Sequence, residues 1–356
     1  MLIPLFIVII LILIVINVVI NVKGKRSNAS YLITERFIEK HLINANGTLT
    51  TSIKPSGQEV LSESIGFWMR YAVEKKDKNQ FDHAYVQLVK HFLKQDGMVY
   101  WKIADNGKCL DFANNLVDDL RIISALLDAG EHWPDSPYPY RKTAEQMTMF
   151  VKSYNRCKDV LIDFYDKGMR YHSNYLTLSS VEVEALGKMR NKGLISNLIY
   201  ESTVKKLLQA PLKDGFFPKS YHTLSEQYIY EKEVDMTEQA LTAYQLTLTG
   251  RGPEAFLTFV KKEFLHKRKI YVRYNRGTKV PTVYEESPAV YSILILCFKE
   301  IGDREFVNKL FRRLLDLRNM KAEDPYYGGY AVSQQKAHLI DNLLPLLAER
   351  KLSSTN

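Results

Sequence analysis

The sequence lacks the features that mark zinc sites, disulfide frameworks and nucleic-acid binding. Its three cysteines, Cys109, Cys157 and Cys297, are far apart and show no C-x-x-C spacing. This pattern predicts buried free thiols. Lys and Arg number 49 against 40 Asp and Glu, and no long basic run carries a nucleic-acid motif. Nucleic acid is therefore not an expected partner, and we expect neither a metal nor a cofactor.

Charged side chains are also absent from the first 22 residues, MLIPLFIVIILILIVINVVINV. About 20 apolar residues in a row are enough to cross a bilayer as one helix. A cleaved secretory signal would have a basic start, a shorter apolar core and a small-residue cleavage site, and this stretch has none of them. We therefore expect an uncleaved transmembrane anchor at residues 1–22, a polar tether at 23–50 and a folded domain at 51–356. The basic residues of KGKR follow the span, and the positive-inside rule taken alone would keep the domain cytoplasmic.

Helical periodicity dominates the remainder of the chain. Two stretches are typical of helical hairpins: SESIGFWMRYAVEKK with QFDHAYVQLVKHFLK, and ESPAVYSILILCFKE with REFVNKLFRRLLDL. Both begin with Glu and Ser close together and carry a Phe near the start of the second helix, which makes them a weak internal repeat. Apolar residues recur at intervals of three and four residues in further windows, at about 31–43, 114–130, 138–156, 179–192, 195–209, 236–249, 253–265 and 331–349. The pattern predicts about twelve helices.

Three segments look extended: VLIDFYDKGMRYHSNYLTL, DGFFPKSYHTLSEQYIY and KIYVRYNRGTKVPTV. So many helices with so few strands predict an all-α fold, an (α/α)6 toroid of helical hairpins with short β-hairpins at one end. In such a toroid the starts of the inner helices converge on one mouth.

Carboxylates stand at the starts of three predicted helices. They are Glu63 in LSESIGFWMRY, Asp118 and Asp119 in NNLVDDLRIIS, and Asp235 in EKEVDMTEQ. Each position also suits a helix cap, and Ser62 offers an N-cap oxygen before Glu63. Two carboxylates on either side of a cleft with aromatic walls can instead hydrolyse a glycosidic bond.

Several blocks resemble glycoside hydrolase family 8. The chain has S-E-S-I-G-F, then MVYWKI, then DDLRIISALLDAG, where the family has S-E-G-x-G-Y, an aromatic–Trp–Lys segment and A-[ST]-D-[AG]-D-L-D-I-A. The resemblance covers roughly residues 50–350 and implies an (α/α)6 barrel with inverting hydrolysis of β-linked polysaccharide. It implies that Glu63 is the general acid and that Asp235, in V-D-M-T-E, resembles the base of the family's Y-D-x-x-R motif.

The chain departs from the family pattern at three positions. Val117 occupies the place of the first helix aspartate when Asp119 matches the second, unless a one-residue slip lets Asp118 fill it. Val234 replaces an aromatic and Glu238 replaces Arg in the motif around Asp235. If Asp235 faces away from Glu63, the substitutes for the base are Glu233 and Glu231.

Sugar faces stack on aromatic rings, so exposed aromatics are expected to line the cleft. The candidates for substrate contact are Trp101, Tyr100, Trp68, Tyr221 and Tyr327. Core packing is the alternative for each of them.

The leading hypothesis is a membrane-anchored, endo-acting hydrolase of an exopolysaccharide or cell-surface glycan, with its domain outside the cell. Burial against Phe67 would raise the pKa of Glu63, and Asp235 would activate water about 6.5–9.5 Å from the acid. An exopolysaccharide synthesis system is a candidate partner. The alternatives are a degenerate toroid that binds glycan without cutting it, and a helical scaffold on the cytoplasmic side.

Overall fold

The computed structural model describes residues 30–53, 59–332 and 337–354. The expected anchor at residues 1–22 lies outside this part of the chain. Among the described residues, no helix has the length and apolarity needed to cross a membrane.

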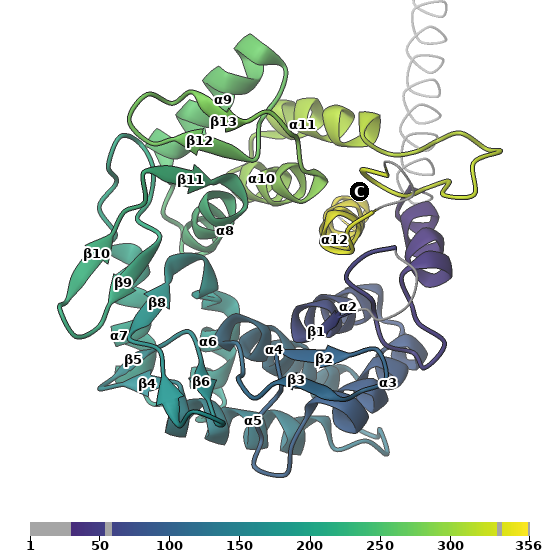
Figure 1. Ribbon diagram of the computed structural model, residues 1–356, viewed down its shortest axis with the longest axis vertical. Coiled ribbons are helices and arrows are strands. Elements are labelled where there is room, and N and C mark those ends of the chain that lie inside the picture. Colours follow the sequence, from purple (N-terminus) through teal and green to yellow (C-terminus); the bar gives the residue numbers. More distant parts are fainter. Residues whose placement is uncertain (1–29, 54–58, 333–336, 355–356) are drawn as a thin grey trace, which may run out of the picture.

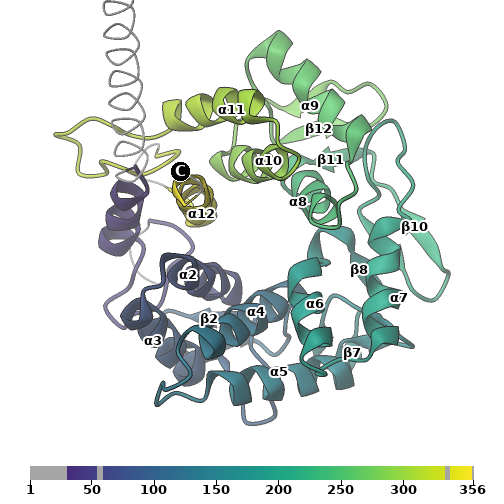
Figure 2. The same ribbon diagram turned by 180° about the vertical axis from the view of Figure 1, so that it is seen from behind.

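The described chain folds into two concentric rings of helices, as Figures 1 and 2 show from opposite sides. The inner ring consists of α2 (Ser62–Lys75), α4 (Leu116–His132), α6 (Val183–Asn191), α8 (Met236–Thr247), α10 (Pro288–Glu300) and α12 (Ile340–Ser353). The outer ring consists of a helix at residues 30–41, α3 (Lys78–Gln87), α5 (Tyr140–Tyr154), α7 (Asn197–Leu208), α9 (Glu254–Lys267) and α11 (Arg304–Asp316). Inner and outer helices alternate along the chain, so the inner helices all run in one direction. This arrangement is the predicted (α/α)6 toroid.

Short antiparallel strands gather where the inner helices begin (Figure 1). The first three-stranded sheet contains β1 (Glu59–Leu61), β2 (Lys102–Ala104) and β3 (Cys109–Asp111). The second contains β8 (Tyr175–Thr177), β9 (Ser220–His222) and β10 (Gln227–Ile229), and the third contains β11 (Glu233–Asp235), β12 (Arg273–Asn275) and β13 (Pro281–Val283). Two hairpins complete the set, β4 (Arg156–Cys157) with β5 (Val160–Leu161), and β6 (Tyr165–Asp166) with β7 (Tyr171–His172). Since β1 leads directly into α2 and β11 into α8, these sheets lie at the mouth of the ring.

The three segments predicted to be extended do contain strands β5 to β10, β12 and β13. The first sheet, together with β4 and β11, lies outside those three segments and was not predicted. The helix expected at 331–349 begins only at Ile340. There are two short helical turns. The π-helix η1 (Leu88–Phe92) follows α3, and η2 (Leu178–Ser180) precedes α6.

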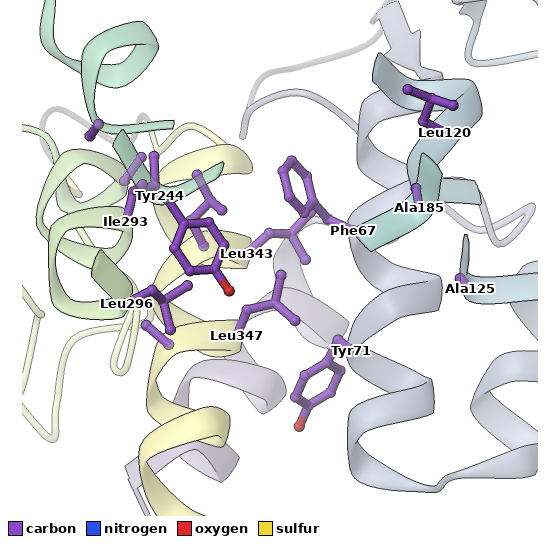
Figure 3. Packing of buried hydrophobic residues seen from close by; sticks show 14 of the residues in the cluster. Phe67, Tyr71, Leu120, Ala125, Ala185, Tyr244, Ile293, Leu296, Leu343 and Leu347 are labelled. Atoms are coloured by element: carbon purple, nitrogen blue, oxygen red, sulfur yellow. The ribbon is translucent and has the colours of Figure 1, made fainter. Parts of the chain in front are cut away.

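The core fills the centre of the ring, where every inner helix contributes an apolar face. Figure 3 shows Phe67 and Tyr71 of α2 opposite Tyr244 of α8, with Leu343 and Leu347 of α12 between them. Each of these side chains is at most 7% exposed. Burial of this kind contributes about 1.5–3 kcal/mol for each large apolar side chain, and it closes the ring.

The expected tether at 23–50 is wrong for its second half. Residues 30–41 form an outer helix whose Phe37 and Ile38 are buried in the core. Thr34 of this helix donates a hydrogen bond to Glu349 of α12 at 3.2 Å. A Cβ on Gly329 would lie 2.4 Å from the Phe37 ring, so only glycine lets that loop approach the helix so closely. The folded domain therefore includes residues from about 30 onward.

Candidate active site

Glu63 lies in the first turn of α2 at the mouth of the ring. The N-cap of α2 is Leu61 and makes no side-chain cap, so the expected capping role of Ser62 is wrong. Ser62 is instead fully buried, and its Oγ donates to Asp118 Oδ2 at 2.7 Å while its backbone N–H donates to the Trp101 carbonyl at 2.9 Å. These two bonds tie the start of α2 to α4 and to the segment before β2.

Helices α2 and α4 approach closely one turn after Glu63. A Cβ on Gly66 would lie 3.4 Å from Ile122 and 3.5 Å from the Arg121 side chain, at the limit of ordinary contact. The two helices therefore pack in direct contact at Gly66, which holds Glu63 on α2 beside Asp118 and Arg121 on α4.

Glu63 and Asp118 share one buried cation. Arg121 Nη1 lies 3.6 Å from Glu63 Oε1 and 3.7 Å from Asp118 Oδ1. The side chain of Glu63 is 37% exposed, whereas those of Asp118 and Arg121 are each 2% exposed. The site therefore opens to solvent through Glu63 alone among these three groups.

Desolvation raises the pKa of both carboxyls. Burial raises the pKa of Glu63, and Arg121 offsets part of that rise. For Asp118, burial first and the neighbouring Glu63 second raise the pKa to about 7, against Arg121 and the hydrogen bonds from Ser62 and Asn115. A carboxyl that keeps its proton near neutral pH is what a general acid requires.

Asp119 points into a different environment. Its Oδ2 accepts a hydrogen bond from Asn114 Nδ2 at 2.6 Å, and Asn114 also bonds Asn155 at 2.9 Å. Burial raises the pKa of Asp119 well above its usual value. Asp118, and not Asp119, is thus the helix aspartate that the structure places beside Glu63.

The sequence analysis missed two residues of this site, Arg121 and Glu182. Glu182 is the N-cap residue of α6, is 4% exposed and accepts from Arg121 Nε at 2.7 Å and from Gln245 of α8 at 3.1 Å. Arg70 of α2 also pairs with it at 3.5 Å. The available signal was an arginine three residues after Asp118 within the otherwise apolar run LRIISALL, where a charge needs a buried partner.

Asp235 immediately precedes α8, a helix that lies across the ring from α2 (Figure 1). It is the N-cap residue, and its Oδ1 accepts from Thr237 N at 2.9 Å and Glu238 N at 3.3 Å. Its Oδ2 lies 3.8 Å from Arg273 Nη2 of β12. One oxygen of Asp235 therefore holds the helix, while the other has no hydrogen-bond donor from the described residues.

Asp235 also lines a polar cavity of about 460 Å³ at the ring mouth. The cavity is lined by Lys219, Glu231, Lys232, Glu233, Asp235, Glu238 and Arg273. Lys219 bridges Glu231 at 3.0 Å and Glu238 at 3.6 Å. Glu63, Asp118 and Trp101 do not belong to this lining, so the structure places the candidate acid and the candidate base in two parts of the mouth.

The aromatic candidates divide into three groups. Trp101 and Tyr100 are half-buried beside the start of α2, with Lys102 over the Trp101 ring at 5.0 Å and Lys94 over the Tyr100 ring at 4.5 Å. Trp68 is only 5% exposed and stacks on Tyr71, and Tyr221 is 5% exposed beneath Lys206. Neither of those rings is free to stack on a sugar.

Tyr327 is 37% exposed but lies in the loop between α11 and α12. That loop packs on the outer helix at 30–41, where His41 bonds the Pro325 carbonyl at 2.9 Å. In Figure 1 the loop extends outward, away from the mouth. The structure therefore separates Tyr327 from the site around Glu63.

The double ring of helices is an (α/α)6 barrel with paired carboxylates at its mouth. The model of glycosyl hydrolases family 8 matches residues 25–181. The chain is 35% identical over 340 residues to the Bacillus subtilis (strain 168) protein named "Putative lipoprotein YdaJ". The matched region covers 94% of this chain and 91% of that protein. The chain belongs to glycosyl hydrolases family 8.

Solved structures share the fold. One is described as a novel alpha-amylase from Clostridium perfringens, with a TM-score of 0.82 and 24% identity, covering 90% of this chain and 97% of that one. Another is endoglucanase Cel10 of Klebsiella pneumoniae, a family 8 glycosyl hydrolase, with a TM-score of 0.63 and 15% identity, covering 91% and 99%.

Proposed function

We propose that this protein cleaves a β-linked polysaccharide with inversion of configuration. Glu63 is the general acid and Asp235 the general base. The observation that carries the proposal is the state of Glu63: it reaches solvent at the ring mouth, yet burial raises the pKa of its carboxyl beside Asp118.

The reaction needs one proton donor and one proton acceptor. Protonated Glu63 gives its proton to the glycosidic oxygen as the bond to the anomeric carbon breaks. A water molecule attacks the opposite face of the sugar and loses its proton to Oδ2 of Asp235, the oxygen that does not cap α8. Such a mechanism places the two carboxyl groups about 6.5–9.5 Å apart, which leaves room for the water.

Trp101 and Tyr100, which are half-buried, are the proposed substrate contacts. Asp118 is buried next to the acid, so its proposed role in substrate binding acts through Glu63 and Ser62. We leave Asp119, Trp68, Tyr221 and Tyr327 out of this set, because their surroundings direct them away from the mouth.

The substrate and the location complete the proposal. Residues 1–22 have the composition of a membrane anchor, and a relative of 35% identity bears the name of a lipoprotein. A membrane-tethered domain outside the cell meets exopolysaccharide or cell-surface glycan, and an exopolysaccharide synthesis system is a suitable partner. Digestion of intact cells with protease tests this arrangement, since a cytoplasmic domain would survive.

A panel of soluble polysaccharides tests the activity. The purified chain is incubated with mixed-linkage β-glucan, carboxymethylcellulose and starch, which is included because one structural relative is described as an alpha-amylase. We expect reducing ends from a β-linked polymer, and proton NMR of the fresh product should show α-anomeric ends first. Initial β-anomeric ends would contradict inversion, and activity on starch alone would contradict the linkage.

One observation favours a second candidate, a toroid that binds glycan without cutting it. One oxygen of Asp235 caps α8, and the other forms an ion pair with Arg273. Retention of a β-linked polymer without release of reducing ends would support this alternative.

A further inference from the structure

Arg121 is a buried cation at the centre of the site, and the proposed mechanism does not use it. Its guanidinium carbon lies 4.3 Å from the centre of the Phe67 ring, and its Nε donates to Glu182. Its Nη1 lies between Glu63 and Asp118, slightly beyond hydrogen-bond distance of each. Within the described part of the chain, neither Arg121 Nη1 nor Asp118 Oδ1 has a hydrogen-bond partner.

An ion-pair network of four charged groups extends from the Glu63–Asp118 pair through three inner helices, and Arg121 is the member that contacts the pair itself. The four are Arg70 from α2, Arg121 from α4, and Glu182 with Glu184 from the start of α6. Glu184 is 41% exposed and is solvated, whereas the other three are less than a fifth exposed.

Asp119 is also buried next to Asp118, and its strongly raised pKa keeps that carboxyl neutral. The remaining buried groups balance when the pair holds one proton, because Arg70 and Arg121 match Glu182 and the single negative charge shared by Glu63 and Asp118. With no proton on the pair, the cluster would hold an uncompensated buried negative charge, which costs several kcal/mol in a poorly solvated site. With two protons, it would hold an uncompensated positive charge.

We propose that Arg121 is a positioning residue that fixes the Glu63–Asp118 pair at one shared proton, and that Glu182 holds its guanidinium in place. The pair then shares one proton, which Glu63 can donate because it is the member that reaches solvent. This inference rests on the proposed role of Glu63 as the acid.

The two ends of the Arg121–Glu182 ion pair have opposite effects. Removing the guanidinium takes a positive charge from the pair, so both carboxyls should hold their protons to higher pH. Removing the charge of Glu182 leaves the cations in excess, so the carboxyls should lose their protons at lower pH. A residue with a merely structural role would produce no such opposite shifts.

The test is a titration of the substrate-free protein by NMR of ¹³C-labelled carboxyl groups. The Glu63 and Asp118 signals are assigned with Glu63→Gln and Asp118→Asn. We expect Arg121→Met to raise the titration midpoint of the pair by about one unit or more. Glu182→Gln should lower it, and Arg121→Lys, which keeps the charge, should stay within about half a unit of the wild type.

Arg318→Met is the matched control. Arg318 is 7% exposed, and it pairs with Glu349 at 3.2 Å and bonds Ser30 of the outer helix at 30–41, not the Glu63–Asp118 pair. Its loss should reduce thermal stability without moving the Glu63–Asp118 titration. An unchanged midpoint in Arg121→Met, or the same shift in Arg318→Met, would overturn the inference. If Arg121→Met does not fold, the downward shift in Glu182→Gln decides it.

Failure of the proposed function would look different. If Glu63→Gln keeps full activity, Glu63 is not the acid, but the titration still reports whether Arg121 controls the pair. If Glu63→Gln is inactive and the titration is unmoved, the function stands and the role of Arg121 does not. Where activity is measurable, the alkaline limb of kcat/KM should shift in the same order as the NMR midpoints.

Discussion

The two carboxylate regions of the ring mouth are built in opposite ways. At α2 and α4, Glu63 and Asp118 lie against a buried arginine, and desolvation raises the pKa of both. At α8, Asp235 is 35% exposed, caps a helix and faces an arginine on a strand. The first region retains a proton, and the second presents an oxygen to an open polar cavity.

The different surroundings of Glu63 and Asp235 assign the acid and base roles more firmly than residue type does. An acid and a base of the same chemical kind can act together only if their surroundings separate their proton affinities. Burial does this for Glu63, whose pKa it raises against the opposing effect of Arg121. Each prediction below tests whether the two regions differ as the geometry indicates.

The largest effect is expected for Glu63→Gln. Glutamine cannot donate a proton to the leaving oxygen, so activity should fall by about 10²–10⁴-fold. Release of reducing ends from the polymer measures this loss. Glu59→Gln is the control, because it removes an exposed carboxylate four residues earlier, and it should remain fully active. Equal losses in both variants would remove the distinction on which the acid assignment depends.

Asp235→Asn should come next, with a loss of about 10²–10³-fold. Asparagine still caps a helix but cannot take a proton from water, so the melting temperature should change little. Asp303→Asn is matched to it, since Asp303 caps α11 through a 3.0 Å bond from Phe306 N. A variant at Asp235 that stays active would return the residue to a capping role and direct the search to Glu233 and Glu231.

Adjacent aspartates of α4 should differ in their effects. Asp118→Asn removes the carboxyl that shares a proton with the acid and should lower activity by about 10-fold or more, since a titrating neighbour changes the acid's pKa. Asp119→Asn alters an internal contact with Asn114 and should change activity less than threefold, within the range of a small local perturbation of roughly 0.6 kcal/mol. Steady-state rates of both variants on one polymer make the comparison, and the reverse order would mean that the helix presents Asp119 to the sugar.

The smallest effect concerns stability and pH. The pKa of Asp118 is raised to about 7 in the fold from a usual value of 3.8. Its protonation therefore contributes stability that is fully present below about pH 3.8 and is lost as the pH rises through 7. As the pH rises between these limits, the free energy of unfolding of Asp118→Asn should increase relative to that of the wild type by about 1 kcal/mol or more, which thermal unfolding measures. A constant difference from pH 4 to pH 8 would show that the carboxyl is not desolvated.

Much of the site was open to sequence reasoning because helix starts were visible. Glu63, Asp118 and Asp235 each stand where apolar periodicity begins, and the ring brings those starts to one face. Trp68 was a poor candidate for a physical reason: it stands one residue after Phe67 in a helix that is buried on nearly all sides, so its ring is 5% exposed. Composition alone does not separate such a ring from Trp101.

The sequence by itself determined the helical hairpins, their approximate limits and the carboxylates at the ring mouth, because periodicity of apolar residues is a local property. Tertiary structure alone decided which carboxylates meet. An α-helix turns about 100° per residue, so Asp118 faces Ser62 and Glu63 while Asp119 faces Asn114. The tertiary structure also decided that Arg121, Glu182 and Arg70 meet at the centre, because their pairing depends on how three helices pack and not on any spacing along the chain.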